Sequence, residues 1–289
     1  MNLVILKCSL LKNLVCFFNG EKQILLFAQD DNRENMVNET KNAHFEYVLH
    51  LGDNALILGQ RLSEWCGHGP VLEEDIALAN IALDLIGQSR LLLSHAALLE
   101  AQGRDEDALA YLREANQFMN FTLLELPNGD FAFTIVRNVL FSAYQCQLWQ
   151  ELSQSRDTEL AAIAAKSIKE SRYHLRHSGE WLIRLGDGTE DSHRRAQAAM
   201  DELWPYTAEM FVDLSSDNEL VSAGVAIAPA SLEAPWREEV ASWLTDAMLS
   251  APAATRFTSG GRRGVHSEHF GFLLAEMQVL HRAHPGAKW

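Results

Sequence analysis

The sequence predicts an all-α protein built around a four-helix bundle. Residues with high helix propensity, mainly Ala, Leu, Glu, Gln and Arg, dominate the 289-residue chain, which contains only seven prolines. Apolar residues recur at alternating spacings of three and four, the period of an amphipathic helix. Few clusters of Val, Ile and Thr alternate with polar residues as they would in strands. These observations indicate helices throughout the chain.

The first two helical stretches are expected to form a pair. The first starts at about residue 44 and ends at Cys66-Gly67-His68-Gly69-Pro70, since proline cannot continue a helix. The second covers 72–100 and carries acidic residues in its first turn, where negative charge favours the helix dipole. The residues expected on its buried face are Ile76, Ala79, Leu83, Ile86 and Leu93.

Further helical stretches follow. A shorter helix at about 105–125 precedes two long ones, at about 131–154 and 158–185. A fifth starts near Thr189 and is interrupted at Trp204-Pro205. The rest of the chain is expected to consist of a loop at 214–231, a helix at 232–249, a flexible basic loop at 258–264 and a helix at 267–283. Four long helices with a connection of over 25 residues between the second and third are typical of a ferritin-like bundle with one long crossover. Periodicity alone is equally compatible with other helical bundles.

Charge and cysteine content exclude several classes of function. The formal net charge is −15, and a surface this acidic repels the phosphates of nucleic acid. The four cysteines, at positions 8, 16, 66 and 146, lack the CxxC spacing and suit a reducing cytosol. No apolar run approaches the roughly 18 residues of a membrane span. We therefore expect a cytoplasmic protein with no nucleic-acid or membrane partner.

The N-terminal segment differs in composition from the remainder. Lys7 and Lys12 interrupt its apolar stretches, and its composition changes at 30–35, just before Met36. We expect residues 1–40 to be a non-core extension, disordered or dispensable, and residues 41–289 to form a single ferritin-like helical domain. Removing residues 1–35 should leave folding and assembly unchanged.

The helix at 158–185 contains an incomplete metal-binding motif. Di-iron carboxylate bundles bind iron through a Glu on each of two helices and a Glu-x-x-His on each of the other two. His174 occupies the position of the motif's histidine, but the residue three before it is Ser171. Glu170 lies about 100° away around the helix and cannot share the face of His174 in the same way. A hydroxyl in place of a carboxylate removes an anionic bridging ligand.

The other helices lack the remaining ligands. Between Phe131 and Gln150 there is no Asp or Glu at all, and Asp84 is followed three residues later by Gly87. Asp84 is expected to be a buried acid paired with an arginine or with Gln88. On the first helix the polar candidates are Asp53 and Gln60, neither of them a Glu. We therefore expect neither a metal site nor catalytic residues, only degenerate site positions at Asp53, Asp84, Ser171 and His174.

A search for an acidic residue three before each histidine finds only Glu190 before His193. This pair follows Thr189 at the start of a helix, so we expect Glu190 to complement the helix dipole.

The basic loop is a second candidate site. It comprises Gly260, Gly261, Arg262, Arg263 and Gly264. Glycines expose backbone N–H groups, and two arginines can bind a phosphate bidentately. The loop is equally compatible with an ordinary solvated turn, and a salt bridge to a partner is a further role. If it binds a phosphate, its replacement should leave the melting temperature almost unmoved.

From about Tyr47 to Trp289 the chain resembles the PaaC-type subunits of bacterial ring-1,2-phenylacetyl-CoA epoxidase, also called phenylacetate-CoA oxygenase. The stretches that carry the resemblance are Leu51-Gly52-Asp53-Asn54, Glu64-Trp65-Cys66-Gly67-His68, residues 78–84, residues 169–176, residues 260–269 and Ala275-Glu276-Met277-Gln278. They are spread over nearly the whole chain after residue 46, and residues 1–35 lie outside them.

The resemblance implies a ferritin-like structural subunit with no cofactor of its own. In that family a homologous partner holds the di-iron centre, and a separate reductase with FAD and an iron–sulfur cluster supplies electrons from NADPH. The complex epoxidises the aromatic ring of phenylacetyl-CoA in phenylacetate catabolism, which makes contact with phenylacetyl-CoA an expectation for the basic loop. The alternative is a ferritin-like oxygenase or oxidase in its own right, with Asp53, Asp84, Glu170 and His174 as irregular ligands.

Overall fold

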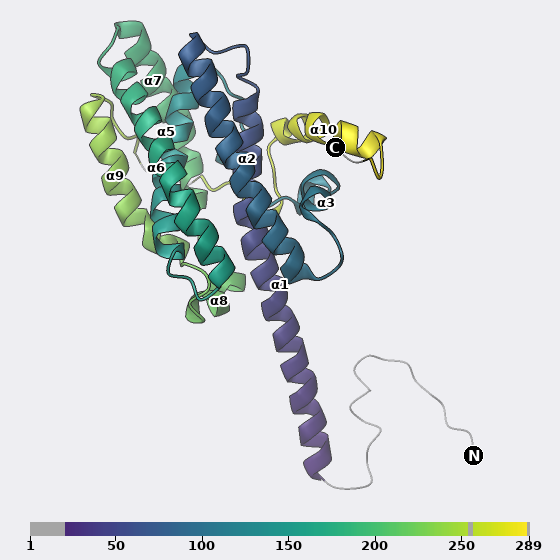
Figure 1. Ribbon diagram of the computed structural model, residues 1–289. Coiled ribbons are helices and arrows are strands. Elements are labelled where there is room, and N and C mark those ends of the chain that lie inside the picture. Colours follow the sequence, from purple (N-terminus) through teal and green to yellow (C-terminus); the bar gives the residue numbers. More distant parts are fainter. Residues whose placement is uncertain (1–20, 254–256, 288–289) are drawn as a thin grey trace.

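The computed structural model describes residues 21–253 and 257–287, with side chains from residue 41 onward. Within these ranges the chain contains no β-strand, and one isolated antiparallel bridge joins Gly260 to Val265. Most of the helices lie side by side in an elongated bundle (Figure 1). The all-α prediction is confirmed.

Four long helices form the ferritin-like bundle. They are α1 (Glu21–Ser63), α2 (Leu72–Glu100), α5 (Phe131–Leu152) and α6 (Thr158–Gly186). α1 packs mainly on α2 and α5 on α6, and the long crossover between these pairs runs from residue 101 to 130. The sequence placed α2, α5 and α6 to within two residues at each end, because each begins or ends at a local signal. Asp130 and Asp157, for example, accept backbone N–H bonds as the N-caps of α5 and α6.

α1 begins earlier than its apolar stripe suggested. It is helical from Glu21, and in Figure 1 its N-terminal part projects beyond the bundle. The expected boundary at residue 40 therefore falls inside a helix and not in a disordered segment. Residues 1–20 of the expected extension lie outside the described residues.

α5 is the central helix of the second half of the molecule. It is buried on nearly all sides, between α6, α7 (Glu190–Leu203) and α9 (Glu233–Asp246). The indole N–H of Trp236 on α9 donates a 2.9 Å hydrogen bond to the carbonyl of Leu140 on α5. α9 also lies close against α6, where a Cβ at Gly179 would come within 2.5 Å of the Trp243 ring.

Short helices replace two predicted features. The single helix expected at 105–125 is wrong, since α3 (Glu106–Tyr111), η2 (Ala115–Gln117) and α4 (Thr122–Glu125) divide it. The expected loop at 214–231 is partly helical. The elements between α7 and α9 are η3 (Trp204–Phe211), η4 (Ser215–Asp217), α8 (Asn218–Ser222) and η5 (Pro229–Leu232). Segment η6 (Gly261–Arg263) and α10 (Glu268–Ala283) complete the described chain, and α10 lies beside α3 (Figure 1).

The predicted buried face of α2 is wrong. Ile76 and Leu83 are 53% and 65% exposed, whereas Leu78, Leu85 and Leu92 are buried. α2 is apolar on two faces, so its periodicity could not show which face packs on α1. By length and composition alone α2 could cross a membrane, but 44% of its most apolar window is buried inside the molecule. We interpret it as a core helix with an apolar outer face.

The long crossover is attached to one polar face of α1. His50 contacts the carbonyl of Met119 through Nδ1 at 2.6 Å, and the Asn54 side-chain oxygen accepts the N–H of Phe121 at 2.8 Å. Arg61 donates through Nε to the carbonyl of Glu125 at 3.0 Å. These side chains satisfy backbone groups that would otherwise be buried without partners, a cost of about 1–3 kcal/mol each.

The C-terminal segment returns to the same crossover. His266 faces the buried carboxylate of Glu125 through Nδ1 at 2.6 Å and the carbonyl of Phe118 through Nε2 at 3.0 Å. Burial lowers the pKa of His266, but the hydrogen bond and the charge of Glu125 outweigh it, so the pKa lies above its usual value. Both ring nitrogens face acceptors, which favours the protonated ring.

We predict that His266 makes stability depend on pH in one direction. Its pKa is higher in the folded than in the unfolded chain, so its contribution is complete below the unfolded value of about 6.5 and is lost as pH rises through the folded value. In urea unfolding, His266→Gln should therefore lose more stability at about pH 6 than at about pH 9. The control is His193→Gln, whose ring bonds the carbonyl of Gly186. Equal losses at both pH values for His266→Gln would contradict the protonated pair.

Candidate functional site

Three polar pairs join α2 to α6 along one side of the bundle. His174 lies 3.0 Å from Asp84, and His177 lies 2.9 Å from Glu74, each measured from Nε2 to a carboxylate oxygen. Gln88 donates to Glu170 at 2.9 Å. In each pair a carboxylate meets an imidazole or an amide, so the side chains that could have been metal ligands bind one another.

The interior beside these pairs is polar but uncharged. Ser167 and Ser171 of α6 are buried, and no described atom hydrogen-bonds to their hydroxyls. Across the bundle, α5 contributes the buried amides of Asn138 and Gln145, each with unpaired polar atoms among the described residues. A di-iron carboxylate centre needs bridging anions, which hydroxyls and amides cannot replace. The residues at the bundle centre do not fit such a centre.

The structure brings together only some of the predicted degenerate positions. Asp84 and His174 are in contact, and Ser171 lies one turn from His174 on the same helix. Asp53 lies elsewhere: its carboxylate accepts two bonds from the Arg113 guanidinium and one from the Met119 N–H at 2.9 Å, all within the crossover. Asp53 is therefore committed to holding the crossover and cannot serve as a ligand at the centre.

The predicted environment of Asp84 also needs correction. We expected a buried acid paired with an arginine or with Gln88. The Asp84 side chain is 39% exposed, and its partner is His174. Gln88 reaches Glu170 instead, because α6 packs antiparallel beside α2 and brings both residues within reach.

The basic loop is ordered, and this overturns the expectation of a flexible loop. The Gly261 N–H donates to the Thr122 hydroxyl, and a Cβ at Gly261 would lie 2.2 Å from the carbonyl of Asn120. The N–H of Arg262 donates to the buried Glu209 carboxylate at 2.8 Å. The glycines allow close contact with the crossover, and their N–H groups face the protein.

The two arginines of the loop have different roles. Arg262 is 6% exposed, and its guanidinium pairs with the buried carboxylate of Asp217. It cannot bind an external phosphate in this position, so the prediction is wrong for Arg262. Arg263 is exposed, and contact with an acyl-CoA phosphate or a partner stays a prediction for that residue alone.

A cleft of about 340 Å³ lies between α5, α6 and α9. Its lining includes Cys146, Arg172, Arg176 and Glu239. Burial raises the pKa of Cys146 to about 12, so its thiol stays protonated near neutral pH. The cleft is therefore unsuited to thiolate chemistry.

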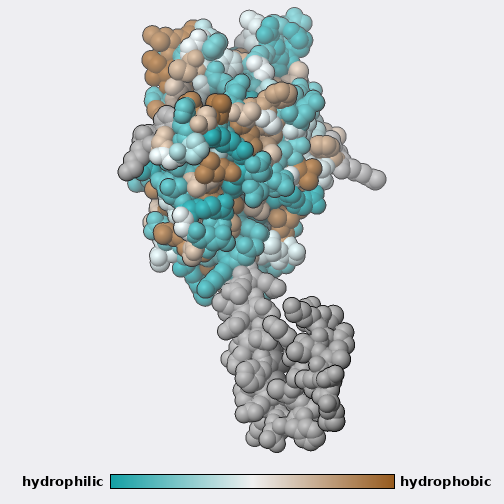
Figure 2. Space-filling view, turned by 90° about the vertical axis from the view of Figure 1, so that its right-hand side faces the viewer, coloured by the Kyte–Doolittle hydropathy of each residue, from teal (hydrophilic) through white to brown (hydrophobic). Residues whose placement is uncertain are grey.

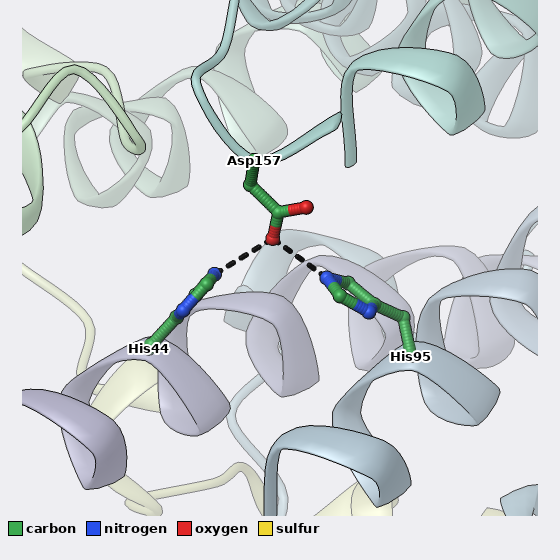
Figure 3. Close-up of side chains that lie close together, drawn as sticks. All are labelled: His44, His95 and Asp157. Carbon is green, nitrogen blue, oxygen red and sulfur yellow. Dashed lines mark hydrogen bonds and ion pairs between the residues drawn. The ribbon is translucent and has the colours of Figure 1, made fainter. Parts of the chain in front are cut away.

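Sequence reasoning missed a cluster of three ligand-type side chains, His44, His95 and Asp157 (Figure 3). The two imidazole Nε2 atoms lie 2.8 and 2.6 Å from the same carboxylate oxygen, Oδ2 of Asp157. The residues come from α1, α2 and the start of α6, and a search for an acid three positions before each histidine could not find them. No local signal in the sequence indicates this cluster.

Comparisons with known proteins agree with this architecture. A family model described as phenylacetic acid catabolic protein matches residues 27–289. A protein of Escherichia coli (strain K12), named as the C-type subunit of 1,2-phenylacetyl-CoA epoxidase, is 51% identical over 243 residues. That alignment covers 84% of this chain and 98% of the relative. The family match starts before Tyr47, so part of the expected N-terminal extension lies inside it.

We predict that the two loop arginines differ sharply in their effect on stability. Arg262→Ala should cost about 3–5 kcal/mol of unfolding free energy, because it leaves the buried Asp217 carboxylate without its cation. Arg263→Ala is the matched control and should change stability by no more than about 0.5 kcal/mol. Urea unfolding of both variants measures the difference. Small and equal losses would show that the loop is exposed in solution and that Arg262 is free to bind an anion.

Proposed function

The chain belongs to the family of phenylacetic acid catabolic proteins, and on that basis we propose that it is the non-catalytic structural subunit of a multicomponent di-iron oxygenase that epoxidises the aromatic ring of phenylacetyl-CoA. A homologous catalytic subunit would hold the two irons. Further subunits and a reductase with FAD and an iron–sulfur cluster would complete the complex in the cytoplasm.

The donor set at the bundle centre is the observation that carries the proposal. α5 supplies no carboxylate, Ser171 presents a hydroxyl, and Asp53 is bound by Arg113. The alternative, an oxygenase with irregular ligands, would require Asp53 to leave a buried ion pair, at a cost of about 3–5 kcal/mol. The ferritin-like frame without the ligand set supports a scaffold role.

We predict that the chain expressed alone contains no stoichiometric iron. The measurement is elemental analysis of the tag-free protein, with the catalytic subunit as the positive control. Two irons per chain together with a di-iron electronic spectrum would contradict the scaffold role. Full epoxidase activity from the catalytic subunit and reductase, with this chain absent, would also contradict it.

The exposed apolar face of α2 is our candidate for the surface that meets the catalytic subunit. Leu72, Ile76 and Leu83 recur at spacings of four and seven, so they lie on one stripe of a 29-residue helix about 43 Å long. A long stripe suits an obligate interface, which typically buries about 2,000 Å² or more. α10 also exposes apolar side chains, among them Phe272, and apolar patches interrupt the hydrophilic surface on its side of the molecule (Figure 2). α10 is shorter, at 16 residues.

Charge reversal on these two surfaces should distinguish them. The double variant Ile76→Asp/Leu83→Asp should fold with an unchanged melting temperature but no longer co-purify with the catalytic subunit, because two charges would be buried in the interface. Phe272→Asp on α10 is the control and should still co-purify. Assembly of the α2 variant with normal yield would rule out this face, while loss of assembly only with Phe272→Asp would place the interface on α10.

A further inference from the structure

We propose that His44, His95 and Asp157 form a binding site for one divalent transition-metal ion of the zinc class. This site lies outside the bundle centre. Asp157 begins α6 and His174 follows it by 17 residues, which corresponds to roughly 25 Å along the helix. The inference is independent of the proposed scaffold function, because the three residues take no part in the α2–α6 pairs.

The ligand atoms are already assembled. Two imidazole nitrogens and one carboxylate oxygen lie within 4.8 Å of one another, and each nitrogen is within 2.8 Å of Oδ2 of Asp157. In a tetrahedral zinc site, with bonds of about 2.0–2.1 Å, neighbouring ligand atoms are about 3.3 Å apart. The three groups would need to separate by only about 0.6 Å, which side-chain rotation can supply.

The carboxylate is held in place by its second role. Oδ1 of Asp157 caps α6 by accepting the N–H groups of Glu159 and Leu160 at 3.0 and 3.1 Å, while Oδ2 faces the two histidines (Figure 3). The Asp157 N–H also donates to the hydroxyl of Ser155. Burial raises the pKa of Asp157, but the bonds from His95, Leu160 and His44 outweigh it and hold the pKa below its usual value. The carboxylate is therefore ionised and fixed in position near neutral pH.

The donor types select the metal. Two imidazoles and one carboxylate suit zinc and its neighbours, cobalt, nickel and copper, better than calcium or magnesium, which prefer oxygen ligands. The side chains of His44, His95 and Asp157 are 20%, 10% and 8% exposed, so a solvent molecule can reach the fourth position. On binding, each Nε2 becomes a ligand atom and the ring proton moves to Nδ1 or to solvent.

A metal here would connect both halves of the bundle. His44 is on α1, His95 on α2 and Asp157 at the start of α6, so one ion would join the α1–α2 pair to the α5–α6 pair. Binding only to the folded chain stabilises it by mass action. We therefore expect a structural metal site, not a catalytic one.

The test uses the tag-free full-length chain, stripped with a chelator and titrated with Zn²⁺ in a calorimeter. We expect uptake of one ion and a rise in melting temperature on the order of 5 °C at a hundredfold excess over the dissociation constant. His44→Gln and Asp157→Asn should each weaken binding at least tenfold. The asparagine retains the helix cap, so Asp157→Asn tests the ligand and not the fold.

A matched control and a spectroscopic measurement make the outcome decisive. His177→Gln breaks a similarly buried histidine–carboxylate pair that has no third ligand, and it should leave zinc uptake unchanged. Co²⁺ should give visible absorption bands of a tetrahedral or five-coordinate ion in the wild type and not in His44→Gln. If the wild type binds no more Zn²⁺ than His44→Gln, or if both variants bind it equally well, the proposal is overturned and the cluster is only a hydrogen-bonded clamp.

Discussion

The attachment of the long crossover to α1 is the constraint on which the remaining structure depends. A connection that lies across a bundle loses water from its backbone, and each unpaired N–H or carbonyl group would then cost free energy. α1 supplies the missing partners from one face, where His50, Asp53, Asn54 and Arg61 follow one another at helical spacing. The polar residues of α1 are therefore directed toward the crossover and not toward the bundle interior.

This arrangement explains the character of the interior. With Asp53 bound to Arg113 and no acid on α5 between Phe131 and Gln150, carboxylates remain only along α2 and α6. There they pair with imidazoles or an amide, so no like-charged carboxylates are buried together. Hydroxyl and amide groups cost less to bury than ionised groups. The bundle can keep the shape of a ferritin-like protein without the metal that neutralises such a cluster of acids in di-iron carboxylate bundles.

The C-terminal segment depends on the same crossover. Glu125 meets His266, and Glu209 accepts the N–H groups of both Thr122 and Arg262. Two buried carboxylates thus join segments that are more than 80 residues apart in the chain. The close approach also explains the glycines of the basic loop, since a Cβ at Gly261 would overlap the crossover backbone. A loop that suggests phosphate binding by its composition is here an internal brace, apart from Arg263.

The sequence by itself determined the features that depend on near neighbours. Helix propensity, N-caps and proline positions act over a few residues, so the limits of α2, α5 and α6 and the cap at Thr189 could be predicted. The acid-free α5 and the missing carboxylate at Ser171 are likewise properties of the sequence alone.

Only the tertiary structure decided which apolar face of α2 is buried, because both faces have the helical period and the choice depends on how α1 packs. It also decided the partners of Asp53 and Arg262 and the convergence of His44 and His95 on Asp157. These contacts join residues 45 to 113 positions apart, and the distance between such residues is set by how whole helices pack and not by any local pattern.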